Sequence, residues 1–204
     1  MSTGVVATVG GEALFVGEVD VREQRLRATR LASALPHAGT SEGRQLRRWL
    51  TQLMVTERVV AAQADVLGVV AEGAPTEREL LPDTVARMEL GSVAASVLEQ
   101  PLARAMFAHV TAHVDVSELQ VADYHARNPD RFAPATLDTS GWRRPMARAS
   151  LADVRPAIAE HLRAAARRRA FRGWLEARCA ELVELAPGYE HPGDPRQPDN
   201  THRH

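Results

Sequence analysis

The sequence predicts a mainly α (α+β) protein with a small β element, and three observations carry this prediction. Apolar residues recur at three- and four-residue steps through 150–185, a pattern typical of one long amphipathic helix. A second periodic apolar run occupies 44–67. Near the N-terminus, two short β-prone runs flank Gly10 and Gly11, as in a β-hairpin. We therefore expect helices to supply most of the core.

The N-terminal third reads as the hairpin followed by two helices. Gly68 should end the second helix, because glycine readily takes the left-handed conformation found after a helix C-terminus. In order, the expected elements are strands at 5–9 and 13–16, a helix from about Glu18 to Ala34, a loop at 36–43 and a helix at 44–67.

The middle of the chain is less regular. Thr76 and Glu79 form a capping box for a short helix. The helical pattern of 92–113 contains Pro101, which should kink or split it. Ser117 then caps another short helix. The later elements are that helix at 118–127, stopped by Asn128-Pro129, and a linker at 133–149.

The long C-terminal helix begins at Ser150, with Asp153 three residues on as an acidic variant of a capping box. A short strand is expected to follow at 181–185. The predicted apolar stripe comprises Leu151, Val154, Ile158, Leu162, Ala166, Ala170 and Trp174, and near the end of the helix it is widened by Phe171, Leu175, Cys179 and Leu182.

Composition excludes several function classes. The formal net charge is -1, so the total charge implies no nucleic-acid or membrane partner. The chain contains no lysine, which excludes a Schiff-base lysine and a P-loop lysine. Cys179 is the single cysteine, so an intrachain disulfide and a Cys-based zinc site are excluded; we read this side chain as a small buried hydrophobe. No signal-peptide pattern and no run of 18 apolar residues occurs, and we expect a cytoplasmic protein.

One stretch is more specific than the rest. An apolar-x-apolar-Ser-Glu start leads into a short helix that carries Tyr, followed by Asn-Pro and Phe. The segment resembles part of the SurA-like and parvulin-type chaperone-isomerase family, as do the opening hairpin and the closing helix. The residues that carry the resemblance are Val116, Ser117, Glu118, Tyr124, Asn128, Pro129 and Phe132.

The resemblance implies a SurA-like helical chaperone module with an N-terminal hairpin and a long C-terminal helix. Residues 1–75 would pack with 150–187, and 76–132 would form a second helical lobe. The segment 133–149 would replace the isomerase domain, since it is too short for a catalytic sheet. A polar His-, Pro- and Asp-rich tail follows at 188–204.

We therefore expect a cytoplasmic binding protein without prolyl isomerase activity. It would hold an apolar peptide, protein or small molecule in a helical cleft between the lobes. Tyr124, Phe132 and Trp142 are the candidate ligand-binding residues; core packing is the default for the first two, whereas Trp142 lies in a polar linker. The sequence does not define the oligomeric state.

The alternative is a repurposed scaffold that acts as a small enzyme or ligand-binding protein through the C-terminal histidines, with or without a divalent metal as its cofactor. His109 and His113 have the four-residue spacing of a helical metal pair. The competing interpretations are that the pair are surface or hydrogen-bonded core histidines near a helix end, and that the tail is disordered and solvated. The tail supplies further candidate ligands in His191, His202 and His204, with Glu190, Asp194 and Asp199 nearby.

Five arginines gather in the C-terminal helix. Glu160 and Glu176 lie within three or four residues of some of them, so a solvated, ion-paired face is expected, with anionic ligand binding as the alternative. The arginines are Arg163, Arg167, Arg168, Arg169 and Arg172.

Overall fold

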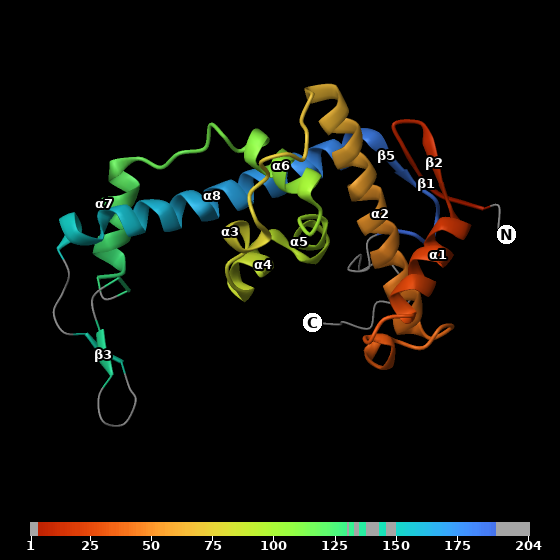
Figure 1. Ribbon diagram of the computed structural model, residues 1–204, viewed down its shortest axis with the longest axis horizontal. Coiled ribbons are helices and arrows are strands. Elements are labelled where there is room, and N and C mark those ends of the chain that lie inside the picture. The colour runs from red at the N-terminus through yellow and green to blue at the C-terminus, as the bar shows by residue number, and fades with distance from the viewer. Residues whose placement is uncertain (1–3, 130, 133–134, 138–142, 146–149, 191–204) are drawn as a thin grey trace.

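The computed structural model describes residues 4–129, 131–132, 135–137, 143–145 and 150–190. Within these residues the protein is mostly helical, with a small antiparallel sheet at one end (Figure 1). This confirms the predicted mainly α class with a small β element.

The sheet joins the two ends of the described chain. Strands β1 (Val5–Val9) and β2 (Glu12–Phe15) form the predicted hairpin, with both turn glycines at positive φ. Strand β5 (Val183–Leu185) pairs antiparallel with the other edge of β1, so the order is β2-β1-β5. Thr8 lies opposite Ala13 on one side and Glu184 on the other.

Helices α1 (Val16–Arg27) and α2 (Ser41–Leu67) follow the hairpin. The prediction of one helix as far as Ala34 was wrong, because α1 ends at Arg27 and only a short 3-10 turn, η1 (Ala32–Ala34), follows. Helix α2 begins before the predicted residue 44, since the Thr40 hydroxyl caps it by accepting a hydrogen bond from the Gly43 amide. Gly68 ends α2 in the left-handed conformation, as predicted.

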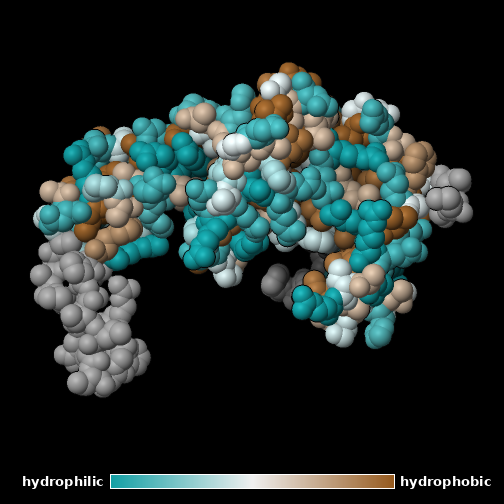
Figure 2. Space-filling view, viewed as in Figure 1, coloured by the Kyte–Doolittle hydropathy of each residue, from teal (hydrophilic) through white to brown (hydrophobic). Residues whose placement is uncertain are grey.

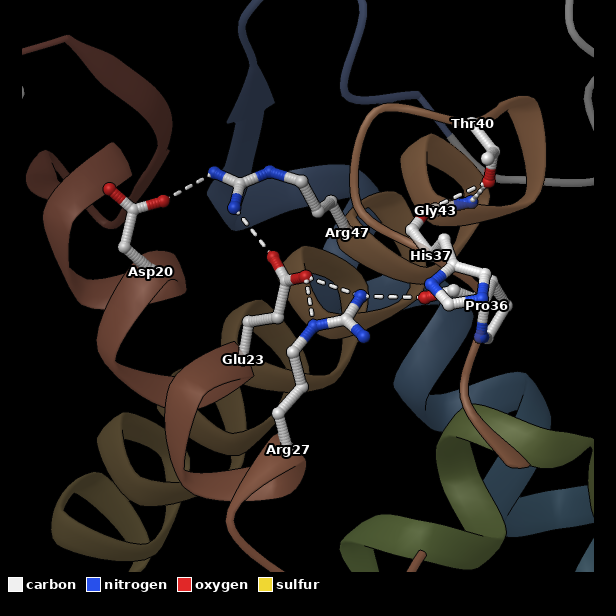
Figure 3. A network of polar contacts seen from close by, with 8 residues as sticks. All are labelled: Asp20, Glu23, Arg27, Pro36, His37, Thr40, Gly43 and Arg47. Carbon is white, nitrogen blue, oxygen red and sulfur yellow. Dashed lines mark hydrogen bonds and ion pairs between the residues drawn. The ribbon is translucent and has the colours of Figure 1, made fainter. Parts of the chain in front are cut away.

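Polar contacts pin the loop between α1 and α2 (Figure 3). The Glu23 side chain, only 8% exposed, accepts hydrogen bonds from Arg27 (2.8 Å) and Arg47 (2.7 Å). Arg27 also donates to the Pro36 carbonyl at 2.7 Å. A Cβ atom on Gly43 would lie 2.3 Å from the His37 carbonyl oxygen, so the loop passes too close to α2 for any other residue there.

Four short helices fill the centre of the molecule: α3 (Glu77–Leu80), α4 (Thr84–Leu90), α5 (Ser92–Val97) and α6 (Pro101–Val110). The Thr76–Glu79 capping box forms as predicted. Pro101 splits the predicted helix and occupies the first turn of α6, where its missing N–H costs no helical hydrogen bond.

Helix α8 (Leu151–Leu182) spans the molecule and contacts α2, α4, α6, α7 and β5 (Figure 1). Ser150 caps it as predicted. Of the predicted apolar stripe, Val154, Ile158, Phe171 and Leu175 are buried. The prediction was wrong in the middle of the helix, where Ala165 and Arg168 are buried and Ala166 and Ala170 are only partly so. The buried residues of α8 are Val154, Ile158, Ala165, Arg168, Phe171 and Leu175.

Helix α7 (Glu118–Arg127) packs on the N-terminal half of α8, away from the sheet (Figure 1). Beyond α7, strands β3 (Ala135–Leu137) and β4 (Arg143–Pro145) pair antiparallel, so the predicted linker contains a small ladder. No helix of the described residues is long and apolar enough to cross a membrane.

Candidate functional site

A pocket of about 300 Å³ lies where α2, the α4–α5 turn and α8 meet. We call it the interhelical pocket. All three segments that were predicted to border a cleft contribute to it, because α2, the central helices and α8 share one core cluster. Its apolar lining residues are Leu90, Val93, Ala94, Leu175 and Cys179; its polar ones are Gln52, Thr56, Ser92, Arg172 and Glu176, and Gly91 completes it.

A sharp turn shapes one wall of this pocket. Gly91 joins α4 to α5 with φ of 91°, a conformation that other residues rarely adopt. The turn brings Leu90 from the end of α4 and Val93 from the start of α5 to the same side. The Trp49 indole N–H of α2 donates to the Ser92 hydroxyl at 3.3 Å, which ties the start of α5 to α2.

Cys179 forms part of the opposite wall. Burial raises the pKa of its thiol, and a hydrogen bond with Thr56 opposes that shift in the lowering direction. The side chain is half-buried, so it borders the pocket without being sealed in the core. At neutral pH it is therefore a protonated, weakly polar thiol.

Two charged side chains stand at the rim. Arg172 donates from Nη1 to the Glu89 carbonyl at 3.2 Å, and its Nε lies 3.3 Å from the Glu176 Oε1. Both rim side chains are at least half exposed. Arg168, one turn earlier, differs: it is 5% exposed and donates to the Glu89 carboxylate at 2.8 Å. The expectation of a fully solvated arginine face was therefore wrong at Arg168.

The last described residues run past the same pocket. Gln52, which lines it, donates to the Tyr189 carbonyl at 3.1 Å, and Arg48 donates to the Gly188 carbonyl at 3.1 Å. These bonds fix the end of the described chain on α2. The predicted metal ligands His191, His202 and His204 lie beyond it, outside the described residues.

Two of the predicted ligand-binding aromatics, Tyr124 of α7 and Phe132 beyond it, lie in a different cluster that packs on α8. The Tyr124 ring centroid lies 6.2 Å from that of Phe132 and 5.5 Å from that of His161. Phe132 lies 5.9 Å from His161, which the sequence did not single out. The structure thus brings Tyr124 and Phe132 together but places neither in the interhelical pocket. Trp142 lies outside the described residues.

His161 makes the packing of this cluster sensitive to pH. Burial lowers its pKa most, and the positive charges of Arg131 and Arg168 lower it further, while Glu89 and Asp83 act in the opposite direction. Because the pKa is lower in the folded state, the unfolded chain binds the proton more readily once the pH falls below about 6.5. We expect this contribution to stability to be complete at higher pH and to be lost on acidification.

Urea denaturation at pH 7.5 and pH 5.0 checks this expectation. The loss of stability between the two should be smaller in His161→Phe, which keeps an aromatic ring but cannot titrate. The exposed His109→Phe serves as a matched control and should lose as much as the parent protein. An equal loss in all three proteins would mean that His161 does not carry the effect.

The histidine pair on α6 does not form as expected. The helix ends at Val110, so exposed His109 lies in its last turn and exposed His113 lies in the turn beyond. The prediction that both share a helical face was therefore wrong. Within the described residues, no group of three or more His, Cys, Asp or Glu side chains is placed to hold a metal ion.

Sequence reasoning predicted a cleft between the lobes but missed the residues that form it. Leu90, Val93 and Leu175 are ordinary apolar residues whose meeting depends on the angle at which short helices cross α8. Gly91 was the one available signal, since a glycine between two helical patterns marks a turn.

Comparison with known proteins places only the N-terminal part. A family described as a "family of unknown function (DUF7158)" matches residues 5–42. This segment includes the hairpin, α1, the pinned loop and the first residues of α2, and it stops short of the interhelical pocket. No curated protein matches the chain. No solved structure matches it either.

Proposed function

We propose that this protein is a SurA-like binding protein without prolyl isomerase activity, which holds an apolar peptide, protein or ligand in the interhelical pocket. The main support for this proposal is the pocket itself. It is mainly apolar and is bordered by three separate segments, which is typical of a ligand site. Two charged side chains, Arg172 and Glu176, stand at its rim, where they can orient a ligand.

Two further features favour a binding role. Figure 2 shows the side below α8 hollowed between the central helices and the part that carries α7, as a cradle would be. On α4, Val85 and Met88 are 63% and 75% exposed, and they follow one another on the same helical face. Exposed apolar groups of this kind suit reversible contact with apolar chains.

The proposed lack of isomerase activity rests on the segment between α7 and α8. Its described residues form only β3 and β4, two strands of three residues each. The metal-dependent alternative depends on His191, His202 and His204, outside the described residues, and no contact among the described residues favours it.

A pocket-filling variant tests the binding role. Val93→Trp places a large ring in the interhelical pocket, whereas Val66→Trp adds the same ring at a position of α2 that is 76% exposed and lies outside the pocket. We expect Val93→Trp to weaken binding of a fluorescent apolar peptide, and suppression of aggregation of an unfolded client, by roughly tenfold or more. Val66→Trp should retain most of both, and neither protein should accelerate prolyl isomerisation.

Equal binding by the two variants would show that the pocket is not the binding site. Failure of the parent protein to bind any apolar peptide or ligand would overturn the binding role itself. Far-UV circular dichroism establishes that both variants are folded.

A further inference from the structure

The rim of the interhelical pocket carries one charge of each sign, above apolar walls. Arg172 and Glu176 stand one turn apart on α8, and among the described lining residues they alone are charged. Leu90, Val93 and Leu175 line the pocket below them. The lining is therefore neutral overall but strongly dipolar at its edge.

A fitting ligand has an apolar group beside two opposite charges that lie close together. An apolar α-amino acid has this arrangement, because its ammonium and carboxylate are attached to the same carbon. We propose that the pocket binds a free apolar α-amino acid, with its carboxylate on Arg172, its ammonium on Glu176 and its side chain between Leu90, Val93 and Leu175. This rests on the proposed binding function and names the ligand class for the same site.

The existing contacts allow the rim to open for such a ligand. Arg172 and Glu176 form an exposed pair at four-residue spacing, and pairs of this kind contribute little to stability. The bond from Arg172 to the Glu89 carbonyl holds the guanidinium at the rim while its other donors turn to a carboxylate. Glu176, with 69% of its side chain exposed, can move without disturbing the core.

Size and polarity agree with one amino acid. A volume of about 300 Å³ lies at the small end of ligand pockets, which suits a single residue better than a length of chain. The protonated Cys179 thiol and the Ala94 methyl group offer an apolar inner surface to the side chain.

Cys179 provides a direct measurement, because it is the only cysteine in the sequence and it lines the pocket. Its reaction rate with a disulfide reagent reports whether the pocket is occupied. The probes are L-phenylalanine, N-acetyl-L-phenylalanine without the ammonium, L-phenylalaninamide without the carboxylate, and N-acetyl-L-phenylalaninamide, which mimics an internal residue of a peptide. We expect L-phenylalanine to slow the reaction and each analogue to bind roughly tenfold or more weakly.

Two matched substitutions assign the charges. In Glu176→Gln, N-acetyl-L-phenylalanine should approach L-phenylalanine in affinity. The Glu176 carboxylate, which has no ligand ammonium to pair with when this analogue is bound, is absent from the variant. In Arg172→Gln, L-phenylalaninamide should approach L-phenylalanine in affinity, because the variant lacks the guanidinium that would have no ligand carboxylate to bind. Both positions are exposed, so these variants should fold normally, as circular dichroism would check.

Equal protection of Cys179 by all four probes, unchanged in both variants, would overturn this proposal. The binding function would remain in place, since the pocket would then recognise the apolar side chain alone. The proposal also fails, and the binding function stands, if no probe slows the reaction while an apolar peptide still binds in a manner sensitive to Val93→Trp. If neither the probes nor peptides bind, both the proposal and the proposed function fail.

Discussion

Replacing Phe171 with alanine should cost about 3–5 kcal/mol of unfolding free energy, the largest loss expected for any single truncation in this protein. Its ring is fully buried in α8. The ring centroid lies 5.0 Å from that of Phe107 on α6 and 5.7 Å from that of Trp174. The cluster around it joins α2, the central helices and α8, so the cavity left by alanine would lie where three segments meet.

Phe15→Ala is the matched control, because it removes the same side chain from a position that is 42% exposed. Urea denaturation followed by circular dichroism measures both, and the control should lose less than about 1.5 kcal/mol. Similar losses in the two variants would show that the core is not centred on Phe171. Phe171 also precedes Leu175 by one helical turn, so the first variant should in addition weaken ligand binding in the interhelical pocket.

Local signals in the sequence predicted many of the individual elements. Gly10 and Gly11 marked the hairpin, Gly68 the end of α2, and Ser150 the start of α8, because each acts through its own backbone or a hydrogen bond three residues away. Predictions of this kind need no knowledge of the rest of the fold, and the structure confirms them.

Predictions that depended on helix packing were less accurate. The predicted stripe on α8 ran through Ala166 and Ala170, but Ala165 and Arg168 are the buried residues there, because the angle at which the central helices cross α8 is not defined by periodicity. Arg168 is the clearest example. The sequence groups Arg168 with arginines that were predicted to be solvated, yet this residue is buried and pairs with Glu89 on α4.

For the candidate site, the sequence predicted the general position of the cleft but not the residues that line it. A cleft between lobes followed from the predicted return of the C-terminal helix to the N-terminal part, and the pairing of β5 with β1 shows that return. No local sequence signal predicted the residues that line the pocket, since Gln52, Val93 and Cys179 are far apart in sequence and ordinary in type. The aromatic residues attracted attention instead, and Tyr124 and Phe132 pack on α7 and α8.

The second large effect is expected at Glu23, where a charge lies inside the N-terminal part of the fold. Glu23→Gln should cost about 2–3 kcal/mol, at the lower end of the cost of breaking a buried ion pair. It removes the negative charge that Arg27 and Arg47 share, and it replaces one of the two accepting oxygens with an NH2 group that faces a guanidinium donor. Burial alone would lower the pKa of Arg47, but hydrogen bonds and charges from Asp20 and Glu23 outweigh it and raise that pKa. Both arginine side chains are about one quarter exposed, so water recovers part of the loss.

Asp20→Asn provides the control on the same network (Figure 3). Asp20 also accepts from Arg47 at 2.7 Å, but its side chain is 39% exposed, so this change should cost under about 1 kcal/mol. Trypsin gives a second readout, since Arg27 holds the α1–α2 loop through the Pro36 carbonyl and Arg30 is an exposed cleavage site within that loop. Cleavage after Arg30 should quicken in Glu23→Gln and stay near the parent rate in Asp20→Asn. If cleavage instead quickened in Asp20→Asn and not in Glu23→Gln, the exposed Asp20 carboxylate, rather than the buried Glu23 carboxylate, would be the charge that orders the loop.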